Sequence, residues 1–157
     1  MLANQQNRAQ IADKMERRGL MKALDASQNL LWFDANGRIV DANRNVLNLL
    51  GYSADEILLH DFFDLTIDNQ GQLLSQRRTW LRISTGDLVH NEVSFHGKDR
   101  IDVWASVNYA ALRHDNGETR RVLAILIDLT KWAWKPSGGH RIAQHANFAG
   151  QRLPHQR

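Results

Sequence analysis

Two pairs of carboxylates are the side chains whose spacing first suggests acid–base chemistry in this 157-residue chain. Asp55 and Glu56 follow Ser53 in the pattern of a helix capping box, in which the serine hydroxyl and the Glu56 carboxylate satisfy backbone N–H groups. Asp61 and Asp64 frame an apolar turn and have no obvious base or nucleophile beside them. We therefore expect no catalytic residue and no enzymatic activity of this chain.

The absence of cysteine excludes a further set of chemistries. Without a thiol there is no disulfide framework, no thiolate zinc site, no cysteine nucleophile and no photochemical adduct between a flavin and a cysteine. His90 and His96 are six residues apart on one face of an expected strand, which is too far for one ion. Gly138-Gly139 lacks the Lys-Ser/Thr that follows in a phosphate-binding loop. We expect no metal site.

The positive charge of the chain lies at its two ends. The formal net charge is +3, and the sequence pI is about 9.6. Residues 1–22 carry +3 and residues 131–157 carry +5, which leaves −5 for residues 23–130. A domain that binds nucleic acid carries its basic residues on the folded face that meets phosphate, so we expect no nucleic-acid partner. No apolar stretch approaches the ~20 residues that span a bilayer, and we expect a cytoplasmic protein without a membrane segment here.

The N-terminal segment, residues 1–22, is expected to form a weak amphipathic helix. Within residues 4–18, Ile11 and Met15 lie four positions apart, and Gly19 interrupts the pattern. Such a helix is marginal on its own. Its apolar stripe therefore needs a partner, which is either the sheet of the same domain or the same helix of a second subunit.

The composition of the chain changes near residue 130. Both prolines and the pair Gly138-Gly139 lie beyond that point, and such residues are typical of connecting segments. We therefore place one domain over residues 23–130 and a linker or tail over residues 131–157.

Turn signals divide this domain into five strands, two before a helical middle and three after it. The first two strands surround Asn36-Gly37, a pair that tolerates the positive φ angles of a hairpin turn. The middle is helical from Asn43 until Gly51, again after Ser53, and from about residue 70 to 83. The order β-β-α-α-α-β-β-β predicts an α+β fold with an antiparallel sheet. The expected strands are residues 30–34, 38–41, 88–95, 101–112 and 121–129.

The last two strands differ in how their apolar residues are placed. In the fourth strand, apolar residues alternate with polar ones and Trp104, so one face is committed to the core. The apolar positions are Ile101, Val103, Ala105, Val107 and Tyr109. The last strand is apolar on both faces over residues 122–127, so its outer face must also be covered. The N-terminal helix or a second subunit is the available cover.

Several short motifs, taken in order, resemble a bacterial PAS sensory domain. The first half is carried by Ala23 to Ser27, by Asp41 to Arg44 and by Leu49 to Ile57. The second half is carried by Gly97 to Asp99 before Val103-Trp104, by Asn116-Gly117 and by Ile127 to Thr130. The match covers residues 22–131 without large gaps. The resemblance implies a five-stranded antiparallel sheet with helices on one face and an N-terminal capping helix, in agreement with the strands above.

The end of the domain resembles a known coupling element. Asp128 and Thr130 are similar to the Asp-Ile-Thr signature through which PAS domains act on the next segment of the chain, with Leu129 in place of isoleucine. Further on, residues 141–148 are similar to the lead-in of a GGDEF diguanylate cyclase domain, although Ala149 stands where that family has aspartate. The resemblance implies signalling through an output domain such as GGDEF or EAL, hence cyclic di-GMP. The alternative is an unrelated tail.

The resemblance leaves the cofactor unknown, with FAD as the first alternative and haem as the second. Trp80 is similar in position to a tryptophan that lies beside the isoalloxazine ring, but the positions of the flavin's polar contacts fall near Phe62 and Phe95. Trp80 as an ordinary core anchor is the competing interpretation. A haem would need an inward histidine, for which His60 is the candidate. The candidate cofactor-binding residues are Trp80, Asn43, Asn108 and His60.

The sequence thus predicts a sensory and dimerisation PAS module of a bacterial signal-transduction protein, which passes the state of a cavity or ligand to an output domain. The expected assembly is a homodimer. The alternative is a redox or oxygen sensor domain that binds FAD or, failing that, haem.

Overall fold

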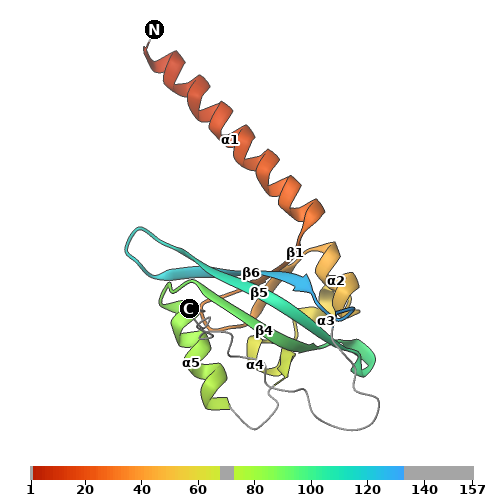
Figure 1. Cartoon of the computed structure of the whole chain (residues 1–157). Helices are drawn as coiled ribbons and strands as arrows, with labels where there is room; N and C mark the ends of the chain where they lie inside the picture. The colour runs from red at the N-terminus through yellow and green to blue at the C-terminus, as the bar shows by residue number, and fades with distance from the viewer. Residues whose placement is uncertain (1, 68–72, 133–157) are drawn as a thin grey trace, which may run out of the picture.

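The structure is a computed structural model that describes residues 2–67 and 73–132. An antiparallel sheet in the order β2-β1-β6-β5-β4-β3 forms one layer, and the shorter helices pack on one of its faces (Figure 1). A long helix, α1, projects away from the domain. The segment similar to a GGDEF lead-in lies outside the described residues.

The expected five strands are confirmed, and a sixth short strand joins them at one edge. The added strand, β3, pairs antiparallel with β4 through Thr66 and Phe95. A strand of two residues is too short to show an alternating pattern, which is why the sequence did not indicate it. The strands are β1 (Asn29–Phe33), β2 (Ile39–Ala42), β3 (Thr66–Ile67), β4 (Val89–His96), β5 (Asp102–Arg113) and β6 (Thr119–Asp128).

The three helices expected between β2 and β4 are present, but a fourth, short helix also forms where the sequence predicted an apolar turn framed by Asp61 and Asp64. The Asn43 side chain caps the first of them, and Gly51 ends it with a φ of 81°. The capping box of Ser53 and Glu56 is present, and a hydrogen bond from Lys98 helps lower the pKa of Glu56 to about 2. The helices are α2 (Arg44–Leu50), α3 (Ala54–Ile57), α4 (Phe62–Leu65) and α5 (Leu73–Ser84), with a short 3-10 turn, η1 (Lys98–Arg100), before β5.

The N-terminal helix is present but is longer than expected and does not lie on the sheet. Helix α1 (Leu2–Ser27) continues through Gly19, so the expected interruption there is wrong. A glycine inside a helix costs only about 1 kcal/mol relative to alanine, which the surrounding helix formers offset. Its described side chains are exposed apart from Leu24, which is half-buried. The cover expected for the outer face of the sheet is therefore not supplied by α1 of the same chain.

The two faces of the sheet carry different side chains. In β5, Val103, Ala105, Val107 and Tyr109 are buried against the helices, which confirms the alternation. Ile101 breaks it, because it precedes the strand and is 66% exposed. The opposite, outer face is also apolar along β6 and β1, where Leu30 is buried but the other apolar residues are only partly covered. We call this set the outer apolar face: Trp32, Leu123, Ile125 and Ile127.

Gly97 marks the closest approach of two backbone segments between β4 and β5. Its N–H donates to the Ile101 carbonyl at 2.9 Å, and the residue is buried. A Cβ atom at this position would overlap with the Ile101 carbonyl oxygen and lie 3.0 Å from the Leu50 carbonyl oxygen. Backbone atoms cannot move aside as a flexible side chain would, so only glycine fits.

We expect Gly97→Ala to lower the free energy of unfolding by about 2 kcal/mol, because the added methyl group overpacks a rigid site. Urea unfolding followed by tryptophan fluorescence measures this change. Gly19→Ala is the matched control: no other residue lies within 4 Å of that position, so stability should be unchanged or slightly higher. Equal stability of Gly97→Ala and the parent would contradict the close approach.

Candidate functional site

A small cavity lies between α5 and the sheet, beside β3. Its volume is about 150 Å³, and side chains from α4, α5, β3, β4 and β5 line it. Gln76 donates from Nε2 to the Thr66 carbonyl at 3.0 Å and to the Thr66 hydroxyl at 2.9 Å, which ties α5 to β3. The lining residues are Phe62, Thr66, Ser75, Gln76, Thr79, Asn91, Glu92, Val93 and Tyr109.

Tyr109 is the polar group of this cavity that reaches deepest into the core. Its side chain is buried, and this burial raises the pKa of the phenol, so the hydroxyl stays protonated near neutral pH. Within the part of the chain that the structure describes, the hydroxyl makes no hydrogen bond. It can therefore donate to, or accept from, a small polar occupant.

Trp80 belongs to the aromatic core rather than to the cavity. Its ring centroid lies 5.5 Å from that of Phe33, 5.0 Å from that of Phe62 and 6.5 Å from that of Phe63. Its Nε1–H donates to the Ala35 carbonyl at 3.1 Å, in the turn between β1 and β2. The indole thus has its hydrogen-bond partner and its apolar contacts within the protein, as an anchor that holds α5 to this turn.

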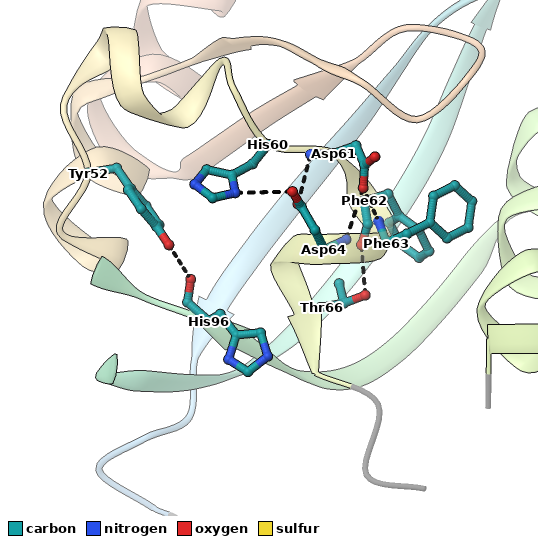
Figure 2. Close-up of polar contacts among 8 residues, drawn as sticks. All are labelled: Tyr52, His60, Asp61, Phe62, Phe63, Asp64, Thr66 and His96. Atoms are coloured by element: carbon teal, nitrogen blue, oxygen red, sulfur yellow. Dashed lines mark hydrogen bonds and ion pairs between the residues drawn. The ribbon is translucent and has the colours of Figure 1, made fainter. Parts of the chain in front are cut away.

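His60 is not among the residues that line the cavity. Its Nδ1 lies 3.2 Å from an Asp64 carboxylate oxygen, and its ring centroid lies 4.9 Å from that of Tyr52 (Figure 2). The Tyr52 hydroxyl donates to the His96 carbonyl at 3.0 Å. Partial burial and, next, the nearby Asp64 carboxylate raise the pKa of Tyr52. The group links α4 to the start of α3 and the end of β4.

The two candidate asparagines lie elsewhere. Asn108 is on the exposed outer face of β5, where its Oδ1 is 2.9 Å from His90 Nδ1. Asn43 caps α2 and also contacts the end of α1. The four side chains expected at a cofactor, Asn43, Asn108, His60 and Trp80, are therefore not brought together, and none of them lines the cavity.

The residues present fit neither a flavin nor a haem. Pockets that hold cofactors and drug-sized ligands are about 300–1,000 Å³. This cavity is about 150 Å³, which is room for about five water molecules. The neighbouring space is filled by the packed rings of Phe33, Phe62 and Trp80. No histidine is among the described lining residues, so a haem iron would lack an imidazole ligand there.

The residues expected to couple the domain to the next segment of the chain do lie together. The Thr130 N–H donates to an Asp128 carboxylate oxygen at 2.8 Å. The Thr130 hydroxyl accepts from the Trp104 N–H at 3.2 Å, and the Leu129 N–H donates to the Trp104 carbonyl at 2.8 Å. The chain leaving β6 is thus hydrogen-bonded to the beginning of β5.

Sequence reasoning missed several of these positions. Gln76 and Thr79 share one helix face with Trp80 and Ile83, a spacing that could have indicated polar groups beside the core. In the sequence, Trp104 stands out only as an outward residue of an alternating strand. Its indole Nε1 is buried and has no hydrogen-bond partner among the described residues.

We expect the protein to retain no flavin. After incubation with excess FAD and removal of free ligand, its absorption spectrum should lack the blue band of oxidised flavin, because the aromatic core leaves no room for the three-ring system. Trp80→Ala, which removes the indole, is the informative comparison: retention of FAD by this variant alone would support the steric argument. A stoichiometric flavin band in the parent protein would contradict it.

No helix among the described residues combines the length and the apolar character needed to cross a membrane. In the same residues, no group of three or more His, Cys, Asp and Glu side chains is placed to hold a metal ion.

Comparison with known proteins agrees with this geometry. The chain is 32% identical over 109 residues to the biofilm dispersion protein BdlA of Pseudomonas aeruginosa, a match that covers 69% of this chain and 26% of BdlA. The chain thus spans about a quarter of the length of that relative.

Two solved structures are similar in fold. A PAS domain of a Colwellia psychrerythraea protein superposes with a TM-score of 0.62 at 20% identity, covering 74% of this chain and 98% of that one. The LOV domain of the blue-light photoreceptor Aureochrome1 superposes with a TM-score of 0.56 at 26% identity, covering 69% and 81%. A family model described as "PAS domain" matches residues 29–131. With the sheet order, the helical layer and this match in agreement, the chain belongs to the PAS domain family.

Proposed function

We propose that this PAS domain is the sensory and dimerisation module of a bacterial signal-transduction protein, and that it reports the state of its cavity through Asp128 and Thr130. The observation that carries the proposal is the bridge between Thr130 and the Trp104 backbone. This bridge ties the outgoing chain to the same strand that contributes Tyr109 to the cavity.

Strand β5 connects the cavity to the chain that leaves β6. Tyr109 and Trp104 lie on opposite faces of the strand, and β5 is hydrogen-bonded on both sides, to β4 and to β6. A strand held in this way moves as a unit. An occupant that displaces Tyr109 would therefore also shift the Trp104 N–H and C=O groups to which Thr130 and Leu129 are bonded. A ligand can shift the output only to the extent that it binds the displaced arrangement of β5 more tightly than the undisplaced one.

The occupant that suits the cavity is small and polar. Gln76, Thr79 and Asn91 supply amide and hydroxyl groups, and Tyr109 supplies a neutral hydroxyl. A flavin-dependent sensor is the second candidate, supported by the 26% identity to a LOV domain. The size of the cavity and the commitment of Trp80 argue against it.

The output is proposed to be cyclic di-GMP signalling in the cytoplasm. Residues 141–148 are similar to the lead-in of a GGDEF domain, and BdlA is named as a biofilm dispersion protein. The partner would then be a GGDEF or EAL domain of the full-length protein.

We expect Thr130→Ala to uncouple the output from the sensory domain, because the bridge to the Trp104 N–H needs a hydroxyl. The measurement is the cyclase activity of a chimera in which residues 1–132 precede a diguanylate cyclase domain; activity should change by about fivefold or more, the equivalent of one lost hydrogen bond of about 1 kcal/mol. Thr130→Ser keeps the hydroxyl and should behave as the parent. Equal activities of the alanine variant and the parent would remove the support for this path.

A second copy of the chain is the proposed cover of the outer apolar face. Trp32 pairs with Leu123 across β1 and β6, and Ile125 and Ile127 continue this surface along β6. Ile127 is 50% exposed, which is high for an apolar residue in the middle of a sheet. Helix α1 adds a further unpartnered stripe, which includes Ile11 and Met15. A homodimer would bury both surfaces at once.

We expect the double variant Leu123→Asp/Ile127→Asp to be monomeric, because each carboxylate would have to be desolvated at the interface. Light scattering measures the mass, which should fall to that of one 18.0 kDa chain. Leu59→Asp is the control, since Leu59 is 84% exposed on the helical side and away from the outer apolar face. Deletion of residues 1–20 should also weaken the dimer. A parent protein that is already monomeric, or a double variant of unchanged mass, would contradict the interface.

A further inference from the structure

In the part of the chain that the structure describes, helix α1 is joined to the domain through its last turn. From residue 3 to residue 23 its side chains are exposed, and Leu24 is half-buried. A helix of 26 residues is about 39 Å long. Its direction relative to the sheet is therefore set by a few contacts around residues 24–28 (Figure 1).

The carbonyl groups at this helix end are capped from outside the helix. The last turn contains no basic residue that could interact with them. Instead, the Asn45 side-chain amide reaches the carbonyl oxygens of Asp25 at 3.1 Å, Ala26 at 3.2 Å and Gln28 at 2.9 Å, which share its two hydrogens. Carbonyl groups at a helix end have no partner within the helix and need hydrogen-bond donors. Asn45 supplies these donors, which the last turn of α1 lacks.

Asn43 also donates to carbonyl groups at this helix end, but it caps α2 as well. Its amide donates to the Asp25 carbonyl at 3.0 Å and to the Gln28 carbonyl at 2.7 Å. Its Oδ1 atom accepts from the Leu30 N–H and from the Val46 N–H, so it also caps α2. Loss of Asn43 would disturb α2 itself. Among the described residues, the side-chain hydrogen bonds of Asn45 go to the last turn of α1 and to the residue that follows it.

This helix end also lies beside the exit of β6. Asn29 donates from Nδ2 to the Leu126 carbonyl at 2.9 Å, and Asp128 lines the same open hollow as Ser27, Asn45 and Asn48. The incoming helix and the outgoing chain thus meet at one end of the sheet, beside α2.

We propose that Asn45 is a positioning residue that fixes the direction of α1, so that α1 is a second arm through which the state of the domain is coupled to other parts of the protein. The claim that α1 couples the domain to other parts of the protein rests on the proposed function. The claim that Asn45 fixes the direction of α1 does not. Because the arm is long, a change of about 10° at its base moves its far end by about 7 Å.

Spin-label distances test this directly, because the chain contains no cysteine of its own. One label is attached at Gln10→Cys on α1 and one at Asp115→Cys in the turn between β5 and β6; both side chains are exposed. Dilution with unlabelled protein isolates distances within one chain. The measurement is made on the parent, on Asn45→Asp and on Asn48→Asp.

We expect Asn45→Asp to broaden the distance distribution by about twofold, because a carboxylate has no N–H to donate and repels the carbonyl oxygens that it faces. Asn48→Asp introduces the same charge one turn later on α2, in the same hollow, where the parent side chain makes no hydrogen bond to described residues; it should leave the distribution unchanged. Equal broadening by both variants, or by neither, would overturn the proposal.

Folding of the domain is checked by the near-ultraviolet circular dichroism of the core tryptophans. If Asn45→Asp fails to fold, Asn45→Ala replaces it and should broaden the distribution in the same direction; an unchanged distribution would overturn the proposal. The measurement needs no output domain, so its failure is distinct from failure of the Thr130 experiment, which reads the output alone.

Discussion

The packing of Trp80 against Phe33 and Phe62 is the interaction on which the rest of the structure depends. These rings join α5 and α4 to the first strand, and the hydrogen bond from Trp80 to Ala35 fixes the orientation of the indole. Because the rings fill the space between the sheet and the helices, the cavity is confined to the polar corner beside Gln76 and Thr66. The same packing explains why this PAS domain has little room for a large planar cofactor.

The sheet connects this core to both ends of the domain. On its inner face, β5 presents Tyr109 to the cavity, while its backbone at Trp104 holds the chain that leaves β6. The entering helix is held by amide groups of α2 at the neighbouring position. Hydrogen bonds to backbone groups, rather than ion pairs, make these connections. Their geometry therefore follows the backbone of the sheet and depends little on ionic strength.

Much of the fold could be predicted because its signals are local. The Asn36-Gly37 turn, the Ser53 capping box and the alternation along β5 each depend on residues a few positions apart, and each lies where the sequence indicates. Predictions were wrong where local rules are weak. Gly19 did not end α1, since one glycine costs less than a long helix gains, and the two residues of β3 are too few to carry a pattern.

The sequence by itself determined the fold class and the faces of the strands, because periodicity and near neighbours decide these features. Only the tertiary structure decided what the polar and aromatic side chains do. Trp80 bonds to Ala35, Asn108 to His90 and Asn45 to the end of α1, in each case across many residues of sequence. A side chain of given type can serve a ligand or the protein itself. Which of the two it serves depends on the groups that folding places within hydrogen-bonding distance.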